Sequence, residues 1–216
     1  MYVIGITGGA GCGKSEAVRF MVSEYGALFI STDEIARKLM ERDGSCYRAV
    51  LSLFGQEAVD EQGDFKRAVI AERIFHSDYE RLALNAVVHP EVKNETAEIL
   101  AELKNNPENA PEFVIVESAL LIEEHYDTIC DEIWYIYASE DTRYRRLHDI
   151  RGWTDSRIRG IFRTQKKEEE FRAFSDVVFD NDGSFEVCQS GIEERVKEIR
   201  QQGVRNIGQS GTVSGE

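Results

Sequence analysis

Hydrophobic residues along the chain fall into short, nearly continuous runs that alternate with longer segments of helical periodicity. Short runs rich in Val, Ile, Phe and Tyr are typical of strands buried on both faces of a parallel sheet. They predict strands at Tyr2–Ile6, Ala27–Ser31, Phe113–Glu117, Glu132–Ala138 and Asp176–Phe179. The periodic segments predict helices at Lys14–Tyr25, Asp33–Glu41, Tyr47–Phe54, Lys66–Phe75, Asp78–His89, Glu91–Asn105, Glu140–Ile150, Asp155–Lys167 and Phe185–Gln202. This alternation predicts an α/β fold, with a parallel sheet and helices on both faces.

The interval between the second and third predicted strands is unusually long. It spans roughly 80 residues, far more than a single crossover needs. Its pattern is almost entirely helical, so we expect residues 33–111 to form a helical insert and residues 139–174 a second, basic helical region. The core would then comprise residues 1–32, 112–138 and 175–202. Residues 203–216 are rich in Gly and Ser and are predicted to be disordered.

A glycine-rich segment, GGAGCGKS, follows the first predicted strand and opens the first predicted helix. Its spacing, Gly8-x4-Gly13-Lys14-Ser15, matches the Walker A pattern of a phosphate-binding P-loop. Glycines let backbone N–H groups approach phosphate oxygens closely, Lys14 can reach the β- and γ-phosphates, and the Ser15 hydroxyl can bind Mg²⁺. The alternative, a glycine-rich turn with a chance lysine, is disfavoured by the strand and helix on either side.

Two carboxylates stand at the carboxyl ends of predicted strands, the edge at which open α/β sheets bind ligands. Asp33 follows the second strand and could orient an acceptor hydroxyl and take its proton. It is equally suited to be the N-cap of the next helix. Glu117 ends the third strand, where it could hold Mg²⁺ directly or through water, or be a solvated strand end. Both interpretations of each residue stay open.

The segment before the fifth strand carries a basic cluster formed by Arg143, Arg145, Arg146 and Arg151. Arginines on a mobile helical flap could close over phosphates and offset the charge that develops in transfer, and Arg146 is the candidate for this catalytic contact. The alternative is a solvated helix face with acidic partners. In the insert, Arg67 could pair with an anionic substrate or lie at the surface. His89 is by itself more readily explained as structural.

Overall charge limits the partners. The formal net charge of −14 argues against a nucleic-acid backbone as ligand. No hydrophobic run approaches membrane-spanning length, so no membrane partner is expected. The four cysteines are far apart and form no zinc spacing, which favours free thiols in a reducing, cytoplasmic compartment. Nothing in the sequence indicates the oligomeric state.

Taken together, these segments resemble the dephospho-coenzyme A kinase family. The likeness runs from about Tyr2 to about Lys197. It is carried by TGGAGCGKS, by DEIAR from Asp33, by GDFKRAVIAERIF from Gly63, by LNAVVHPEV from Leu84, by LLIEE from Leu120 and by SDVVFDNDGS from Ser175, with Gln165 in step. The loop is shared by many P-loop proteins, whereas the segments of the insert are far more discriminating.

The resemblance implies transfer of a phosphoryl group from ATP, with Mg²⁺, to the ribose 3′-hydroxyl of dephospho-coenzyme A. It implies a P-loop kinase core with a five-stranded parallel sheet, an insert that binds the coenzyme and a lid. It makes Asp33 the base and places Arg67 and His89 against the acceptor. The implied ATP-binding residues are Gly8, Gly9, Gly11, Cys12, Gly13, Lys14, Ser15, Glu16, Asn181 and Gly183.

The chain also departs from the family pattern. Glu16 stands where a threonine usually follows GKS, beside the expected α-phosphate. Ser31 replaces the first Asp of a common DAD triplet, and an ungapped match puts Ile150 where a second lid arginine is expected, with Arg151 next to it. These changes keep two alternatives open: a diverged P-loop kinase acting on another small acceptor, and a nucleotide-binding module without catalysis.

Overall fold

The computed structural model describes residues 1–118 and 120–209. It contains a five-stranded sheet in the order β2-β3-β1-β4-β5. The strands are β1 (Tyr2–Thr7), β2 (Leu28–Ser31), β3 (Phe113–Glu117), β4 (Glu132–Tyr137) and β5 (Val177–Asp180). The pairings of β1 and β2 with β3, and of β4 with β5, are parallel. All five predicted strands are confirmed. Most of β1, β3 and β4 is buried, as their continuous hydrophobic runs indicated.

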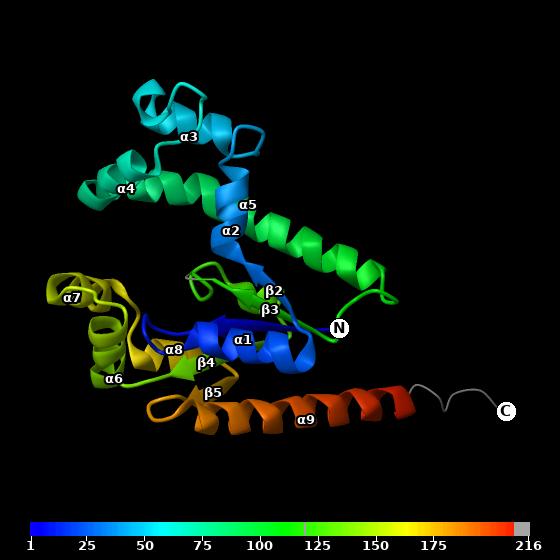
Figure 1. Cartoon of the computed structure of the whole chain (residues 1–216). Helices are drawn as coiled ribbons and strands as arrows, with labels where there is room; N and C mark the ends of the chain where they lie inside the picture. Colours follow the sequence, from blue (N-terminus) through cyan, green and yellow to red (C-terminus); the bar gives the residue numbers. More distant parts are fainter. Residues whose placement is uncertain (119, 210–216) are drawn as a thin grey trace. The chain divides into compact units, whose positions relative to one another are not determined.

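The chain divides into two compact units, and Figure 1 shows its elements along the sequence. Unit 1 comprises Met1–Ile6 and Tyr25–Ile133, and unit 2 comprises Thr7–Glu24 and Trp134–Glu216. The predicted insert therefore lies wholly in unit 1, and the P-loop and the basic region lie in unit 2.

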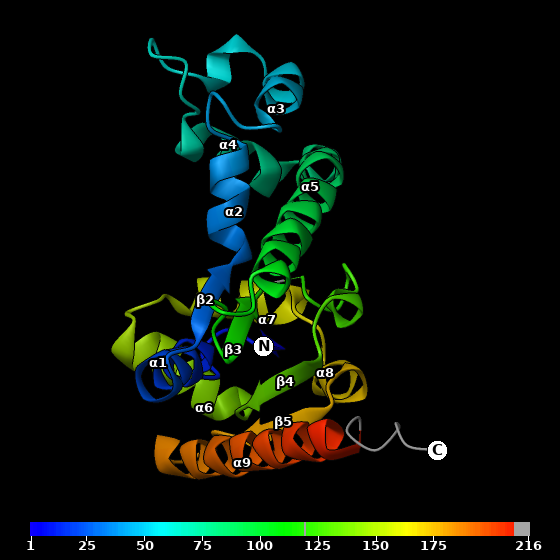
Figure 2. The same cartoon turned by 90° about the vertical axis from the view of Figure 1, so that its right-hand side faces the viewer.

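Four α-helices of unit 1 follow β2: α2 (Thr32–Leu39), α3 (Tyr47–Phe54), α4 (Arg67–His76) and α5 (Asp78–Asn105). Each of the first three packs against α5, which therefore forms the spine of the insert (Figure 2). Two short 3₁₀ turns complete the unit, η1 (Gln56–Ala58) and η2 (Tyr126–Thr128).

Helix α5 corrects the prediction of two helices broken at His89 and Pro90. It is continuous from Asp78 to Asn105, with Pro90 inside it. An internal proline costs a helix about 3 kcal/mol because it removes one hydrogen bond and crowds the preceding turn. The helix buries Val88 and Val92 on either side of the proline, and the packing of three other helices against it offsets that cost.

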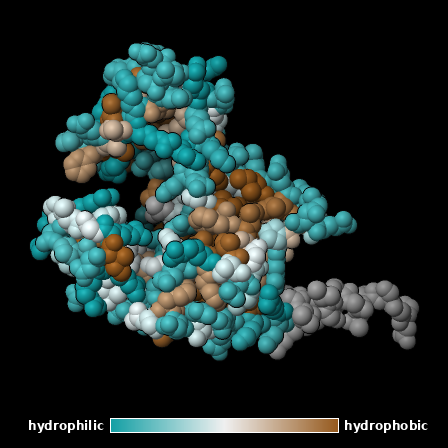
Figure 3. Space-filling model, viewed as in Figure 1, coloured by the Kyte–Doolittle hydropathy of each residue, from teal (hydrophilic) through white to brown (hydrophobic). Residues whose placement is uncertain are grey.

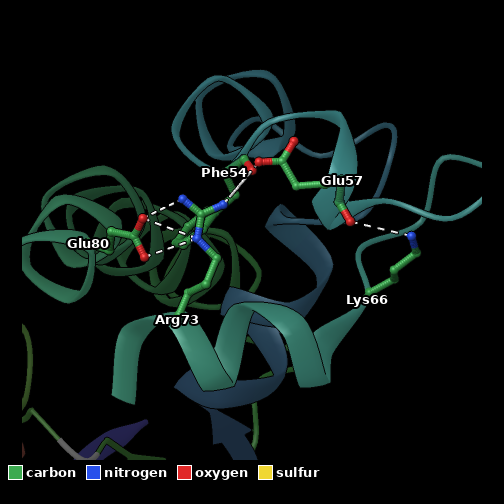
Figure 4. Close-up of polar contacts among 5 residues, drawn as sticks. All are labelled: Phe54, Glu57, Lys66, Arg73 and Glu80. Atoms are coloured by element: carbon green, nitrogen blue, oxygen red, sulfur yellow. Dashed lines mark hydrogen bonds and ion pairs between the residues drawn. The ribbon is translucent and has the colours of Figure 1, made fainter. Parts of the chain in front are cut away.

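An ion-pair network ties three of these helices together (Figure 4). The guanidinium of Arg73 on α4 donates to the carboxylate of Glu80 on α5, and its Nη1 donates to the carbonyl oxygen of Phe54 at the end of α3 over 2.7 Å. The same guanidinium lies over the Phe54 ring, 5.0 Å from its centroid. The hydrogen bond to Glu80 raises the pKa of Arg73, and the reciprocal bond lowers the pKa of Glu80. Arg73 belongs to the quoted motif GDFKRAVIAERIF, so this contact gives the motif a structural reason.

The helices of unit 2 are α1 (Lys14–Tyr25), α6 (Glu140–Arg145), a π-helix η3 (Arg146–Ile150), α7 (Asp155–Thr164), α8 (Glu168–Phe174) and α9 (Phe185–Gln209). Helix α9 runs beside β5 (Figures 1 and 2). Within the described chain, no helix is both long and apolar enough to cross a membrane.

Two helices of unit 2 differ from prediction. Helix α8 was not expected because Phe171 is its only buried position, but a hydrogen bond of 2.9 Å from the backbone N–H of Lys167 to Glu170 Oε2 stabilises its start. Helix α9 continues to Gln209, into the segment predicted to be disordered, because a glycine such as Gly203 costs a helix only about 1 kcal/mol. Residues 210–216 lie outside the described residues, so that part of the prediction has no counterpart here.

Candidate active site

The P-loop leads from the end of β1 into α1, and its glycines adopt conformations that other residues disfavour. Gly11 has φ 83° and Gly13 has φ 101°. A Cβ at position 13 would lie 2.1 Å from Asn181 Nδ2, and one at position 8 would lie 2.6 Å from the carbonyl oxygen of Ile136. The tight packing of the loop against β4 and β5 therefore requires glycine at positions 8 and 13.

Lys14 folds back across the loop that precedes it. Its Nζ donates to the carbonyl oxygen of Gly8 over 2.7 Å and to that of Gly9 over 3.4 Å. The ammonium thus lies beside the first turn of α1, where unpaired N–H groups and the positive end of the helix dipole favour anions. A polyphosphate bound at this helix start would meet both the amides and the lysine.

Ser15, in the first turn of α1, has an exposed side chain and no hydrogen-bond partner for its hydroxyl among the described residues. A hard hydroxyl oxygen of this kind suits Mg²⁺, which usually keeps several waters and takes few protein ligands. No group of three or more His, Cys, Asp or Glu residues gathers to hold a metal in the described chain. The residues present fit a magnesium ion carried largely by a bound nucleotide, not one held by a protein cage.

Residues distant in sequence meet at the P-loop. Arg146 Nη1 donates to the carbonyl oxygen of Cys12 over 3.4 Å, and its Nη2 donates to the carbonyl oxygen of Gly183 over 3.1 Å. Asn181 Nδ2 donates to the same Cys12 carbonyl oxygen over 2.8 Å. The structure therefore brings three predicted site residues, Arg146, Asn181 and Gly183, to the loop.

The four arginines of the basic cluster have different surroundings. Arg143 contacts Ala10 of the loop, whereas Arg145 donates to the hydroxyl of Thr142 over 3.0 Å. Arg151 lies over the ring of Trp153, 5.8 Å from its centroid. None of the four forms an ion pair in the part of the chain that the structure describes, so the acidic partners of the alternative interpretation are not found there, although Arg145 and Arg151 are exposed.

Glu16 is exposed in the first turn of α1, and its carboxylate has no hydrogen bond or ion pair with any described residue. It lies close enough to Cys188 on α9 to affect that thiol. Burial raises the pKa of Cys188 to about 12, and the charges of Cys12 and Glu16 add to the shift. No positively charged side chain among the described residues pairs with the Glu16 carboxylate.

In unit 1, the N-cap of α2 is Ser31, whose hydroxyl accepts a hydrogen bond of 3.4 Å from the backbone N–H of Glu34. The alternative in which Asp33 is the N-cap is therefore wrong. Asp33 lies in the first turn of α2 with an exposed side chain. It lines both of the cavities of unit 1 described below.

The larger cavity, of about 1070 Å³, lies between α2, α4 and the loop after α2. Its charged lining consists of four cations, Arg37, Lys38, Arg42 and Arg67, and four carboxylates, Asp33, Glu41, Asp43 and Asp64. None of the four cationic side chains has a hydrogen bond or ion pair with another described residue. Its apolar wall is formed by Ile70, Ala71, Ile74 and Leu84, and Figure 3 shows hydrophobic side chains at the surface where α4 meets α5. Unpaired cations beside an apolar wall suit a ligand with both anionic and apolar parts.

The smaller cavity, of about 190 Å³, is lined by Asp33, His89 and Asn85. His89 Nδ1 lies 3.1 Å from Glu124 Oε1, and both side chains are partly buried. Lys93 Nζ donates to the carbonyl oxygens of Glu124 and His125 over 2.6 and 3.0 Å. The LLIEE segment is thus fastened to α5, with the imidazole of His89 held at the cavity wall.

Glu117 ends β3, where the sheet register pairs it with Ile6 and with Ser31. Its side chain is half-buried, and its carboxylate has no partner among the described residues. Its predicted role toward magnesium stays a prediction.

Sequence reasoning missed several of these contacts. Arg37 follows Asp33 by four residues on α2, so helical spacing alone could have placed it on the same face. No comparable signal marked Arg42, which lies in the loop after α2 and comes to the cavity only through the tertiary fold. Gln165 was noticed for its place in the resemblance, but its contact with the P-loop had no sequence signal.

A glycine-rich loop that leads from β1 into the start of α1, with Lys14 folded back across it, places the protein in the class of P-loop nucleotide-binding proteins. The family model for dephospho-CoA kinase matches residues 2–186. The chain belongs to the dephospho-CoA kinase family. It is 32% identical over 190 residues to the dephospho-CoA kinase of Carboxydothermus hydrogenoformans, covering 88% of this chain and 90% of that protein. It is 32% identical to the dephospho-CoA kinase of Geobacter sulfurreducens, covering 90% and 96%.

Solved structures agree with the fold. TT1252 from Thermus thermophilus superposes with a TM-score of 0.74 at 30% identity, covering 91% of this chain and 97% of that one. The dephospho-CoA kinase from Campylobacter jejuni gives a TM-score of 0.63 at 21% identity, with coverages of 91% and 98%. The second likeness supports the P-loop kinase fold alone.

Proposed function

We propose that the protein transfers the γ-phosphoryl group of ATP to the ribose 3′-hydroxyl of dephospho-coenzyme A, giving coenzyme A and ADP. The observation that carries the proposal is the presence of two built half-sites in one member of the dephospho-CoA kinase family. Unit 2 holds a P-loop, and unit 1 holds a cavity with unpaired cations and an apolar wall.

In the donor half-site, the amides at the start of α1 and Lys14 would bind the β- and γ-phosphates. Mg²⁺, when bound, neutralises phosphate charge, and the Ser15 hydroxyl is the residue best suited to hold it, with Glu117 acting through water. Arg146 already contacts the loop and Gly183, so a small movement of its guanidinium would serve a transferring phosphoryl group. We place the adenine along Asn181 and Gly183.

In the acceptor half-site, the substrate must present an adenosine, a diphosphate and a pantetheine arm. We assign the diphosphate to Arg37, Arg42 and Arg67, because these cations lack other partners. The apolar wall formed by Ile70, Ala71, Ile74 and Leu84 suits the pantetheine arm. The sugar end would then lie toward Asp33 and the smaller cavity, where His89 stands.

Asp33 would orient the 3′-hydroxyl and accept its proton as the new P–O bond forms. Its exposed position at the head of α2, free of the capping role that Ser31 fills, leaves the carboxylate available for this task. The four cysteines are free thiols, which supports a reducing, cytoplasmic setting for the reaction.

The test is a coupled assay of ADP release from Mg-ATP with and without dephospho-coenzyme A. The proposal predicts release that depends on the acceptor. Arg42→Ala should raise the KM for dephospho-coenzyme A by about tenfold, the usual value of a lost charge-assisted contact, with little change in the KM for ATP. The matched control is Arg48→Ala, an exposed arginine on α3 that does not line the cavity. ADP release unaffected by dephospho-coenzyme A would contradict the proposal.

A further inference from the structure

Both backbone polar groups of Ala10, in the middle of the P-loop, are bound by side chains from the basic helical region. Arg143 Nε on α6 donates to the carbonyl oxygen of Ala10 over 2.9 Å. The backbone N–H of Ala10 donates to Gln165 Oε1 over 3.2 Å. Gln165 lies just beyond the end of α7, so two segments more than 130 residues from the loop meet on one of its residues.

The two side chains also bind each other. Arg143 Nη2 donates to the same Gln165 Oε1 that accepts from Ala10, which closes a three-membered network. The oxygen must face both donors, so the orientation of the Gln165 amide follows from the contacts. The guanidinium carbon of Arg143 lies 4.5 Å from the centroid of the Phe162 ring, and this cation–π contact also holds the arginine in place.

The same contacts remove Arg143 from the arginines available to phosphate. A Cβ at position 9 would lie 2.4 Å from Arg143 Cζ, so the guanidinium packs directly on the loop backbone at Gly9. The Ala10 N–H is likewise committed to Gln165 and does not belong to the phosphate cradle. Arg146, whose contacts are with Cys12 and Gly183, is left as the arginine that can turn to a nucleotide.

We infer that Arg143 and Gln165 are positioning residues that hold the P-loop in its nucleotide-binding conformation through Ala10. This inference rests on the proposed binding of ATP at the loop, but not on the identity of the acceptor. If only a fraction of the molecules has the P-loop in its nucleotide-binding conformation, the apparent Kd for ATP equals the intrinsic Kd divided by that fraction. We call the contacts of Arg143 and Gln165 with Ala10 the brace. The brace keeps the fraction of binding-competent loops high before ATP binds. It also makes the loop conformation depend on Gln165, at the end of α7.

The primary experiment measures hydrogen exchange of the Ala10 amide by NMR in the protein without nucleotide. Gln165→Ala should speed this exchange by about three- to tenfold, the range set by one lost hydrogen bond. Gln165→Glu should keep it slow, because Oε1 only accepts in both contacts and a carboxylate oxygen can do the same. Exchange that is unchanged in Gln165→Ala would overturn the inference, as would equally fast exchange in Gln165→Glu.

The second measurement is the Kd for ATP by calorimetry. Arg143→Ala and Gln165→Ala should each raise it by about three- to tenfold, and the double variant should raise it by less than the product of the two because they break one network. The control Arg172→Ala removes an arginine that also combines one ring contact, with Tyr137, and one polar contact, with Glu168, but touches no loop residue. Its Kd for ATP should equal that of the wild type. Additive effects of the two variants, or an equal rise in the control, would contradict the brace.

These outcomes are separate from those of the proposed function. The Ala10 exchange is read without ATP or acceptor, so failure of the brace appears as unchanged exchange. Failure of the proposed function appears instead as absent transfer to dephospho-coenzyme A in the wild type.

Discussion

The side-chain amide of Asn181 donates a hydrogen bond of 2.8 Å to the backbone carbonyl oxygen of Cys12, 169 residues earlier in the chain. Asn181 is fully buried, and its Oδ1 has no partner among the described residues. The Nδ2 atom also fills the space next to Gly13 where a Cβ would otherwise lie. The end of β5 thus fixes the second half of the P-loop, as Arg143 and Gln165 fix the first.

Asn181→Ala should weaken both the fold and ATP binding. The variant leaves the buried Cys12 carbonyl oxygen with only the long contact to Arg146, and leaving a buried acceptor poorly satisfied costs about 1–3 kcal/mol. Urea unfolding measures the loss of stability, and calorimetry measures the Kd for ATP. Asn109→Ala, which removes an exposed asparagine bonded to Asn106, is the control. Wild-type ATP affinity in Asn181→Ala would show that the loop does not depend on this contact.

Glu16→Thr should tighten ATP binding. The carboxylate stands in the first turn of α1 without a neutralising partner among the described residues, so a bound nucleotide would meet an unscreened negative charge. Removing that charge should lower the Kd for ATP by about two- to tenfold. Added salt screens the charge, so it should reduce the difference in Kd between the wild type and Glu16→Thr. Calorimetry at low and high ionic strength measures both effects.

Glu24→Thr, an exposed glutamate in the last turn of the same helix, should leave the affinity unchanged. A weaker affinity in Glu16→Thr would mean that the carboxylate contributes a contact to the nucleotide, through metal or water, and would refute the repulsion.

Asp33→Asn should separate chemistry from binding. The amide keeps the size of the side chain but cannot accept the proton of the acceptor hydroxyl, so kcat should fall by about 10²- to 10⁴-fold. The Kd for ATP should stay within about twofold of the wild-type value, because the proposal assigns Asp33 to the acceptor and not to the nucleotide. Steady-state kinetics and calorimetry measure the two quantities. A variant with full turnover would remove Asp33 from the role of base.

Asp182→Asn should lower stability in a manner that depends on pH. Hydrogen bonds from Ser139, whose backbone N–H lies 2.8 Å away, hold the pKa of Asp182 below its usual value. A folded-state pKa that is lowered adds stability above the unfolded value, about 3.9, and this stability is lost as the pH falls through the lowered folded value.

The melting temperature of Asp182→Asn should therefore lie below that of the wild type at pH 7, and the gap should close as the pH falls below about 4. Parallel thermal scans at several pH values measure the gap. A gap of constant size from pH 7 to pH 3 would show that the charge of Asp182 contributes nothing.

Local pattern predicted the strands closely, because buried parallel strands such as Phe113–Glu117 leave a continuous hydrophobic signature that few other elements share. The helix across Pro90 was missed because a proline is a local signal for a break, whereas the packing that overrides it comes from α2, α3 and α4. Spacing likewise predicted the P-loop and its lysine. It could not show that Ser31, not Asp33, caps α2, because both residues are good caps and stand only two positions apart.

The contacts that hold the P-loop could not be predicted from local sequence pattern either, because they too depend on tertiary packing. The contacts of Ala10 with Arg143 and Gln165 join residues whose proximity depends on the tertiary fold. Arg143 looked like one of four equivalent arginines, and only its neighbours distinguish it from Arg146.

The most direct test of the central claim is the identity of the product that the protein makes from Mg-ATP and dephospho-coenzyme A. Two-dimensional ³¹P–¹H NMR of the reaction mixture locates the new phosphate on the ribose. The account predicts one new phosphomonoester, coupled to the 3′ proton, and an equal amount of ADP. Release of inorganic phosphate without a modified acceptor, or a phosphate on any other hydroxyl, would contradict it.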